Sequence, residues 1–153
     1  MAKKNKKKDH SAEIIGEIQA IHFHYERAFD QLYADLGISN EQYNVLDILN
    51  DNEAGGMALN EIQVMLPNQT SNTTRLVNKL QLKKLLVKKA DPNDQRKLMI
   101  QITPEGKSVL EKAKVLSIPI NKALKKASSS VSSKTLKQEL KGLRKAIENS
   151  KGL

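Results

Sequence analysis

The sequence contains no cysteine and no tryptophan, and aromatic residues make up only 3% of its 153 residues. The absence of cysteine excludes disulfides, thiolate metal sites and thiol-based redox sensing. Because aromatic side chains are scarce, any core must be built from Leu, Ile, Val, Ala and Met. The chain is nevertheless long enough for one ordinary domain with its own core.

Long apolar runs are also missing. The sequence has no run of about 18 consecutive apolar residues, so we expect no membrane span and no membrane partner. The basic N-terminus lacks the apolar stretch of a secretory signal. We therefore expect a cytoplasmic protein.

The formal net charge of +9 is unevenly distributed along the chain. Residues 1–8 carry five Lys, residues 9–61 carry eleven acids and one base, and residues 62–153 carry twenty bases and six acids. Residues 62–90 contain no acid at all. Such a stretch can be a solvated lysine-rich face, but solvated helices usually mix both signs, so it is a candidate phosphate-binding surface.

Apolar side chains recur at three- and four-residue steps between residues 11 and 36, which predicts a long helix. They are Ile14, Ile18, Ile21, Tyr25, Phe29, Leu32 and Leu36. Ser11 is the predicted N-cap, and Gly37 is predicted to close the helix. Residues 1–10 before it are predicted to be a disordered basic tail, which either adds weak attraction to DNA or only solubilises the chain.

Three shorter helices are predicted next. The second helix begins at Ser39 or Asn40, the third covers 58–66 up to Pro67, and the fourth runs from a cap at Asn68 to about Lys84. The expected inward side chains are Tyr43, Leu46, Leu49, Leu59, Ile62, Leu66, Leu76, Val77 and Leu80. Two short helices joined by a tight turn suggest a helix-turn-helix.

Two β-compatible runs, 86–90 and 98–103, flank a polar loop and predict a hairpin. A hairpin directly after a helix-turn-helix makes a winged helix, so the predicted fold is mainly α with a small β-hairpin wing. A fifth helix begins at Pro104 with Thr103 as its cap, and Pro119 predicts a kink or break inside it. After a linker at 128–133, a sixth helix carries a short apolar seam that must pack on another surface. The seam consists of Leu136, Leu140, Leu143 and Ile147.

The segment DPNDQRKLMIQITPEG resembles the wing signature of the MarR (multiple-antibiotic-resistance regulator) family: D-x-R, five variable residues, L-T, two more, then G. The matching positions are Asp94, Arg96, Ile102, Thr103 and Gly106, with Ile102 in place of the usual Leu. Upstream, TTRLVNKLQLKKLL (73–86) resembles the recognition helix of the family, T-R-L-V-D-R-L followed by K-G-L-V. In this chain Asn78 and Lys79 replace Asp and Arg, and Leu85 replaces Gly.

This resemblance covers roughly residues 11–148. It implies a winged helix-turn-helix DNA-binding domain at 37–103 and a helical dimerisation region at 11–36 and 104–150. It further implies an obligate homodimer, palindromic double-stranded DNA targets and, commonly, a small-molecule effector that weakens DNA binding. The function expected from it is a sequence-specific, ligand-responsive transcriptional repressor.

The fourth helix would enter the major groove by its N-terminal half, with the wing beside it. Arg75 is the best candidate base reader, although a structural pair with Asp91 or Asp94 is about equally plausible. Arg96 is the candidate minor-groove probe, which Asp94 would orient. The full predicted DNA-binding set is Ser71, Asn72, Arg75, Lys79, Lys88, Lys89, Asp94, Arg96 and Lys97.

The resemblance also places an effector cleft near a group of polar and aromatic residues on the first two helices. They are His22, His24, Tyr25, Arg27 and Tyr43. The alternative, that they are ordinary packing and surface residues, is the more probable interpretation.

Metal binding and catalysis have no support in the sequence. His22 and His24 point to different sides of a helix, and no cysteine or later histidine completes a metal site. No Gly-rich phosphate loop or catalytic triad occurs, so neither an enzyme nor a cofactor is expected. The alternative to a DNA-binding regulator is a basic winged-helix module that acts through RNA or protein partners.

Overall fold

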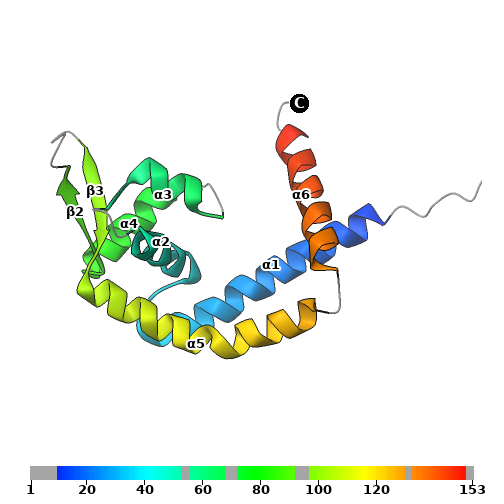
Figure 1. Cartoon of the computed structure of the whole chain (residues 1–153), viewed down its shortest axis with the longest axis horizontal. Coiled ribbons are helices and arrows are strands. Elements are labelled where there is room, and N and C mark those ends of the chain that lie inside the picture. Colours follow the sequence, from blue (N-terminus) through cyan, green and yellow to red (C-terminus); the bar gives the residue numbers. More distant parts are fainter. Residues whose placement is uncertain (1–9, 53–55, 68–71, 92–96, 130–131, 151–153) are drawn as a thin grey trace, which may run out of the picture. The chain divides into compact units, whose positions relative to one another are not determined.

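The computed structural model describes residues 10–52, 56–67, 72–91, 97–129 and 132–150. The described residues form a mainly helical chain with one small antiparallel sheet (Figure 1). In chain order the elements are α1 (Ser11–Tyr33), η1 (Ala34–Leu36), α2 (Asn40–Asp51), β1 (Met57–Ala58), α3 (Leu59–Met65), α4 (Thr73–Leu82), β2 (Leu86–Ala90), β3 (Leu98–Ile102), α5 (Pro104–Ser128) and α6 (Ser133–Ser150). The predicted tail at residues 1–9 lies outside the described part.

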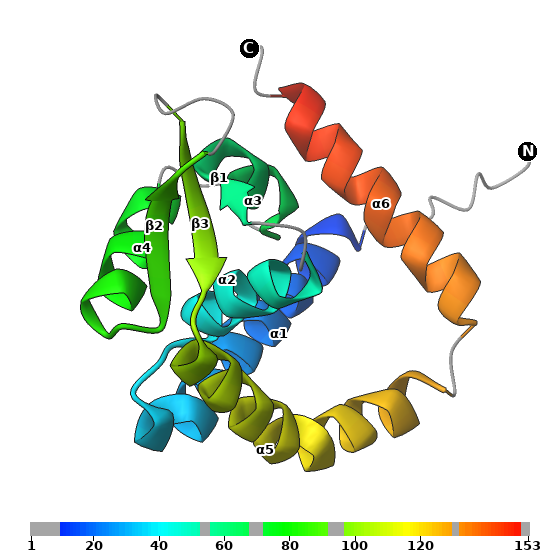
Figure 2. The same cartoon turned by 60° about the vertical axis from the view of Figure 1, so that its left-hand side comes forward.

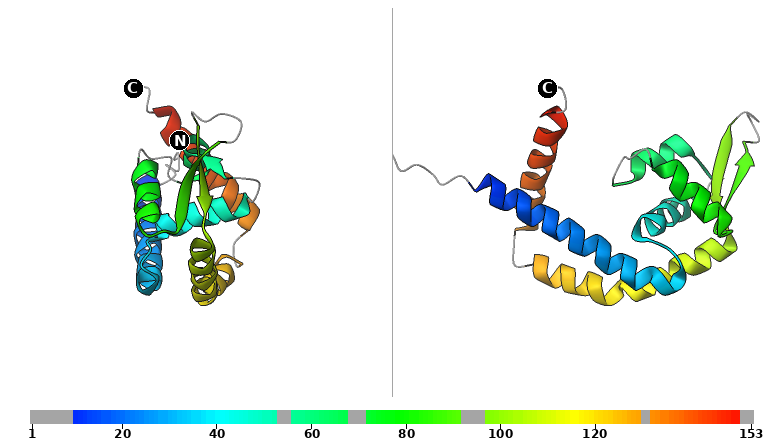
Figure 3. Two further views of the ribbon diagram at one scale, coloured as in Figure 1. Left: turned by 90° about the vertical axis from the view of Figure 1, so that its left-hand side faces the viewer. Right: turned by 180° about the vertical axis from the view of Figure 1, so that it is seen from behind.

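The predicted first helix is confirmed as α1 followed by one 3-10 turn, η1 (Figures 1 and 3). It closes at Gly37, whose φ of 67° lies in the left-handed region that glycine adopts without strain. The predicted cap at Ser11 is wrong. Ser11 is already helical, and His10 holds the N-cap position, with its backbone oxygen accepting the first helical hydrogen bond from Ile14 at 3.0 Å.

α2 begins with a reciprocal capping box. The hydroxyl of Ser39 accepts from the backbone N–H of Gln42 at 3.2 Å, and the side chain of Gln42 accepts from the N–H of Ser39 at 3.3 Å. Leu46 and Leu49 are buried as predicted, whereas Tyr43 is only half-buried and stacks on Tyr33 with 5.1 Å between ring centroids. The capping box therefore decides between the two predicted starts in favour of Ser39.

The helix-turn-helix is formed by α3 and α4, but α4 starts later than predicted. Its N-cap is Asn72, whereas the predicted cap, Asn68, lies among residues 68–71, outside the described part. Helical spacing of apolar residues does not locate this start, because the first buried residue of α4 is Thr73, which is polar. The predicted inward residues Leu76, Val77 and Leu80 are buried.

The hairpin of β2 and β3 is confirmed, and β1 adds a third strand in the order β1-β3-β2 (Figure 2). β1 was missed because it has only two residues, too few for any alternation to be visible. Gly56, just before β1, has a φ of 99°, and a Cβ there would lie 2.8 Å from the carbonyl oxygen of Ile100. Glycine at this position lets the chain approach β3 closely enough to pair with it.

The turn from α4 into β2 forms without the glycine of the family pattern. The residue with positive φ is Lys84, at 59°, while Leu85 is buried at the base of the hairpin. Thr103 holds this turn in place with two hydrogen bonds. Its hydroxyl donates to the carbonyl of Lys84 at 2.8 Å, and its backbone N–H donates to the carbonyl of Leu85 at 3.1 Å. The wing is thus fastened where α5 begins.

α5 begins as predicted, with Pro104 in its first turn and the Thr103 hydroxyl accepting from the N–H of Gly106 at 3.0 Å. The predicted break at Pro119 does not occur, because α5 continues to Ser128. A proline removes the helical hydrogen bond to the carbonyl four residues earlier. That residue is Val115, which is 64% exposed, so water can satisfy the carbonyl.

The chain divides into two compact units, Met1–Leu116 and Ser117–Leu153. The first unit contains nearly all the buried apolar residues, and the ammonium of Lys114 ties α5 to α2 through Asp47 at 3.2 Å. In the second unit, α6 has no buried residue within its described range. Its predicted apolar seam lies at the surface of the single chain.

Candidate nucleic-acid interface

The exposed face of α4 is polar and basic, opposite the three residues that it buries. The helix packs Leu76, Val77 and Leu80 into the core. Its outward residues are Thr74, Arg75, Asn78, Lys79 and Gln81, together with one exposed apolar residue, Leu82, at its C-terminal end. Because α4 and the β2–β3 hairpin are neighbours (Figure 2), this face and the hairpin can contact one extended partner.

Arg75 lies on this face with an exposed side chain. Among the ion pairs of the described residues, none involves Arg75, so the alternative pairing with Asp91 is not observed. Asp94 lies outside the described residues. The guanidinium is therefore presented to solvent with its fork of donors, the group that binds phosphate or a guanine edge in two places.

A groove of about 680 Å³ runs between the start of α2 and α4. Arg75, Lys79 and Lys83 line it on the α4 side. Lys83 donates to the carbonyl of Gly37 and, at 2.8 Å, to the side chain of Gln42. Partial burial and the nearby Lys79 lower the pKa of Lys83. Lys83 therefore joins α4 to the start of α2, which leaves Arg75 and Lys79 as the outward cations.

On the hairpin, the predicted lysines differ in their surroundings. Lys88 is half-buried and donates to the side-chain oxygen of Asn78 at 2.6 Å, which fastens β2 to α4. Lys89 and Lys97 are exposed. Sequence reasoning noted Asn78 only as a departure from the family pattern, because nothing in the residue order indicates a contact between a helix and a strand.

Three predicted DNA-binding residues, Ser71, Asp94 and Arg96, lie outside the described residues. The cap residue Asn72 is described, and it lines the same groove as Arg75 and Lys79. The described part of the predicted set thus gathers on two adjoining elements, α4 and the hairpin.

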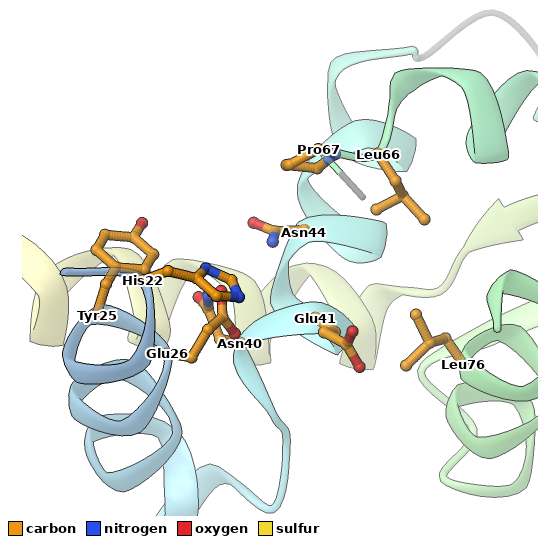
Figure 4. A pocket seen from close by; sticks show the side chains of 9 residues that line it. All are labelled: His22, Tyr25, Glu26, Asn40, Glu41, Asn44, Leu66, Pro67 and Leu76. Atoms are coloured by element: carbon orange, nitrogen blue, oxygen red, sulfur yellow. The ribbon is translucent and has the colours of Figure 1, made fainter. Parts of the chain in front are cut away.

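A second concave site lies between α1, α2, the segment after α3, and α4 (Figure 4). Its volume is about 300 Å³, and nine side chains reach into it. They are His22, Tyr25, Glu26, Asn40, Glu41, Asn44, Leu66, Pro67 and Leu76. We call this site the α1–α2 pocket.

Of the five predicted effector residues, only His22 and Tyr25 line the α1–α2 pocket. Arg27 lines a separate open groove along α1, and the His24 ring packs edge-on against Phe23. Tyr43 stacks on Tyr33, and its burial together with the carboxylates around it raises its pKa to about 12. Tyr43 is thus a packing residue.

Seven of the pocket residues were missed, including both carboxylates, because they come together from α1, α2, the end of α3 and α4. These residues are far apart in the sequence, so no local pattern indicates that they line one pocket. The Glu26 carboxylate accepts from the side-chain amide of Asn40 at 3.1 Å. Burial, and secondarily the charge of Glu26, raise the pKa of Tyr25, so its phenol is neutral at ordinary pH.

Within the described part of the chain, no group of three or more acidic or histidine side chains is arranged to hold a metal ion. Across the same residues, every helix is too short or too polar to cross a bilayer.

The comparisons with known proteins agree with this geometry. Residues 36–97 match the sequence model described as the MarR family. A comparison with curated proteins yields no significant match.

Solved MarR-type structures share the fold along most of the chain. MepR of S. aureus, solved with DNA, is 22% identical, with a TM-score of 0.69 over 86% of this chain and 92% of MepR. MosR of M. tuberculosis, also solved with DNA, is 18% identical, with a TM-score of 0.69 over 89% of this chain and 96% of its own. CouR of Rhodococcus jostii, bound to p-coumaroyl-CoA, is 22% identical, with a TM-score of 0.67 over 90% of this chain and 94% of CouR.

The end of the MarR wing signature has a packing role in this chain. A Cβ on Gly106 would lie 2.1 Å from the carbonyl oxygen of Leu85, so only glycine allows α5 to start against the turn into the hairpin. Thr103 caps α5 and fastens the same turn. These two positions therefore fix the place of the hairpin relative to α5.

Proposed function

We propose that this chain is a MarR-type, ligand-responsive transcriptional repressor that binds palindromic double-stranded DNA as a homodimer. The observation that carries the proposal is the exposed basic face of α4 beside the hairpin, within a stretch free of acids from residue 62 to residue 90. A surface of this kind attracts the phosphate backbone of DNA. The structurally similar MepR and MosR have both been solved with DNA, which supports this partner.

In the proposed complex, the N-terminal half of α4 enters the major groove. Arg75 reads a base edge, and Ser71, Asn72 and Lys79 contact bases or phosphates around it. On the wing, Lys88, Lys89 and Lys97 contact the backbone, Arg96 enters the minor groove and Asp94 orients the wing. Because Lys88 is also bonded to Asn78, phosphate binding at Lys88 would hold α4 and the hairpin together.

A second copy of the chain would cover the apolar side chains that remain exposed on α1, α5 and α6. Among them are Ile14, Leu124, Leu136, Leu140 and Ile147. Leaving such a set in water is unfavourable, and a twofold axis would also present two α4 helices to two half-sites. We therefore assign residues 11–36 and 104–150 to dimerisation and 37–103 to DNA binding.

The α1–α2 pocket is the proposed effector site. It is bounded by α1 on one side and by α2 and α4 on the other, so a ligand there contacts both the proposed dimerisation region and the recognition helix. The ligand would weaken DNA binding if it favours a conformation in which the two α4 helices no longer match the half-sites. CouR, solved with p-coumaroyl-CoA, is a similar structure that binds a small molecule.

Selection from random duplexes, followed by anisotropy titration of the selected site, tests this function. Arg75→Ala should lower the affinity about ten- to hundredfold, because a bidentate base contact contributes about 1–3 kcal/mol. The control is Arg144→Ala on α6, which removes another exposed arginine, one that pairs with Glu148 at 3.7 Å. Arg96→Ala should also weaken binding while the protein stays folded.

Two further outcomes decide the class of partner. Affinity for the selected duplex should fall steeply with salt concentration, since phosphate contacts release counterions. A failure to select any palindrome, together with tight binding of structured RNA, would instead support a winged-helix module that acts through RNA. Equal effects of Arg75→Ala and Arg144→Ala would contradict the assignment of α4.

A further inference from the structure

The α1–α2 pocket is acidic. Two carboxylates, Glu26 from α1 and Glu41 from α2, line it, and none of its described lining residues is Lys or Arg (Figure 4). A third carboxylate, Asp30, lies next to Glu26 on α1 and accepts from the backbone N–H of Asn40 at 2.7 Å. Six of its nine lining residues belong to the segment 9–61, which has eleven acids and a single base.

Several hydrogen-bond donors at the start of α2 that could attract an anion are already engaged. The start of α2 would ordinarily offer free N–H groups and a partial positive charge. In this chain the N–H of Asn40 donates to Asp30, and that of Gln42 donates to Ser39 at 3.2 Å. The side-chain amide of Asn40 donates to Glu26. An entering anion would therefore meet the two carboxylates, and the remaining side-chain donors that line the pocket are those of His22, Tyr25 and Asn44.

The pocket does offer acceptors and apolar surface. Asn40 is only 2% exposed, and among the described residues its side-chain oxygen has no hydrogen-bond partner, although its amide nitrogen does. Leu66, Pro67 and Leu76 supply apolar contacts, and Tyr25 supplies an aromatic ring. An aromatic ring face attracts a cation, and more strongly in a partly desolvated site.

We propose that the α1–α2 pocket selects a small amphipathic cation, an ammonium or amidinium group on an apolar body. The cationic group lies between Glu26 and Glu41 and the body lies against Leu66, Pro67 and Leu76. This proposal rests on the proposed function, because it names the ligand class of the effector site. A polyanion such as p-coumaroyl-CoA, the ligand in the CouR structure, is disfavoured in this pocket.

The test compares three probes of nearly the same size and shape that differ in charge: benzyltrimethylammonium, its neutral isostere neopentylbenzene, and phenylmethanesulfonate. Each is titrated into the full-length protein without DNA and followed by the NMR shifts of backbone amides in α1 and α2. We expect the ammonium to bind about tenfold more tightly than the neutral isostere, with the sulfonate weakest.

Charge-removing variants then locate the site. Glu26→Gln and Glu41→Gln keep the size of the side chain and an accepting oxygen, and each should weaken binding of the ammonium about fivefold without changing binding of the neutral probe. The matched control is Glu17→Gln, an exposed glutamate on α1 that does not line the pocket, which should change neither affinity. Glu41→Gln also serves as the second variant should loss of the Glu26 contact to Asn40 disturb folding.

The outcomes separate this proposal from the DNA-binding function. Tighter binding of the sulfonate or the neutral probe, equal effects of the three variants, or no detectable binding of the ammonium up to its solubility limit would each overturn it. Because binding is measured without DNA, a protein that binds the ammonium but no duplex would contradict the proposed function alone. In the presence of the selected duplex, the ammonium should lower the affinity for DNA, and Glu26→Gln should reduce that effect.

Discussion

α4 and α6 are both amphipathic helices with apolar side chains on one face and basic residues on the other, yet their apolar faces have opposite environments. In α4, Val77 and Leu80 are 0% exposed, whereas in α6 Leu140 is 43% and Ile147 is 54% exposed. This difference in exposure does not come from the helices themselves but from what packs against them. α4 packs against α2, α3 and β2, and the described residues give α6 no comparable set of neighbours. The chain thus completes one core by itself and leaves the apolar face of α6 exposed, the face that a second copy covers in the proposed dimer.

Truncation of one leucine in each helix tests this contrast most directly. Leu80→Ala should lower the free energy of unfolding by about 3 kcal/mol at every protein concentration, because it opens a cavity in a closed core. Leu140→Ala should destabilise the protein mainly where dimers form, so its effect should depend on protein concentration. Urea denaturation at several concentrations, monitored by circular dichroism, measures both. An equal, concentration-independent loss would break the comparison.

The next largest effect on the free energy of unfolding is expected from replacing two glycines, Gly106 and Gly142, with alanine. Gly106→Ala should cost about 2 kcal/mol, since its Cβ would lie 2.1 Å from the carbonyl oxygen of Leu85 and the backbone would have to move. Gly142→Ala in α6 meets nothing within 4 Å and should stabilise the helix by up to about 1 kcal/mol through helix propensity. The same denaturation experiment checks both, and changes of the same sign would contradict the packing described for α5.

The smallest expected effect is the pH dependence of stability that comes from a tyrosine. All three tyrosines belong to the first unit. Tyr43 has a pKa raised from 10.0 to about 12, so the folded state holds the phenol proton more tightly than the unfolded state. Its contribution to stability is fully present below pH 10 and is lost as the pH rises towards 12. Tyr43→Phe should remove that loss and the corresponding step in the phenolate absorbance titration. A step that persists in the variant would assign it to another tyrosine.

Local sequence patterns correctly predicted the features that depend on residues close together in the chain. The burial of Leu76, Val77 and Leu80 followed from helical spacing, and Thr103 with Pro104 marked the start of α5. The same patterns failed at β1, which is too short to alternate, and of the kink or break predicted at Pro119 the break does not occur.

The residues of the candidate sites also fall into those that the sequence could predict and those that it could not. Arg75 and Lys79 could be chosen from sequence because their exposure follows from the burial of their helical neighbours. The carboxylates of the α1–α2 pocket could not, because Glu26 and Glu41 meet Leu66 and Leu76 only after three helices have packed together. Likewise, the contact of Lys88 with Asn78 joins a strand to a helix across a turn.

The amino-acid order alone determined the helical elements, the hairpin and the basic face of α4, because helical spacing, capping and charge act over a few residues. Only the tertiary structure decided which cations are free, which residues line the α1–α2 pocket and how the hairpin is fastened to α5. These depend on contacts between residues far apart in the chain, such as Gly106 against Leu85 and Asn40 with Glu26, whose distances are set by packing and not by sequence spacing.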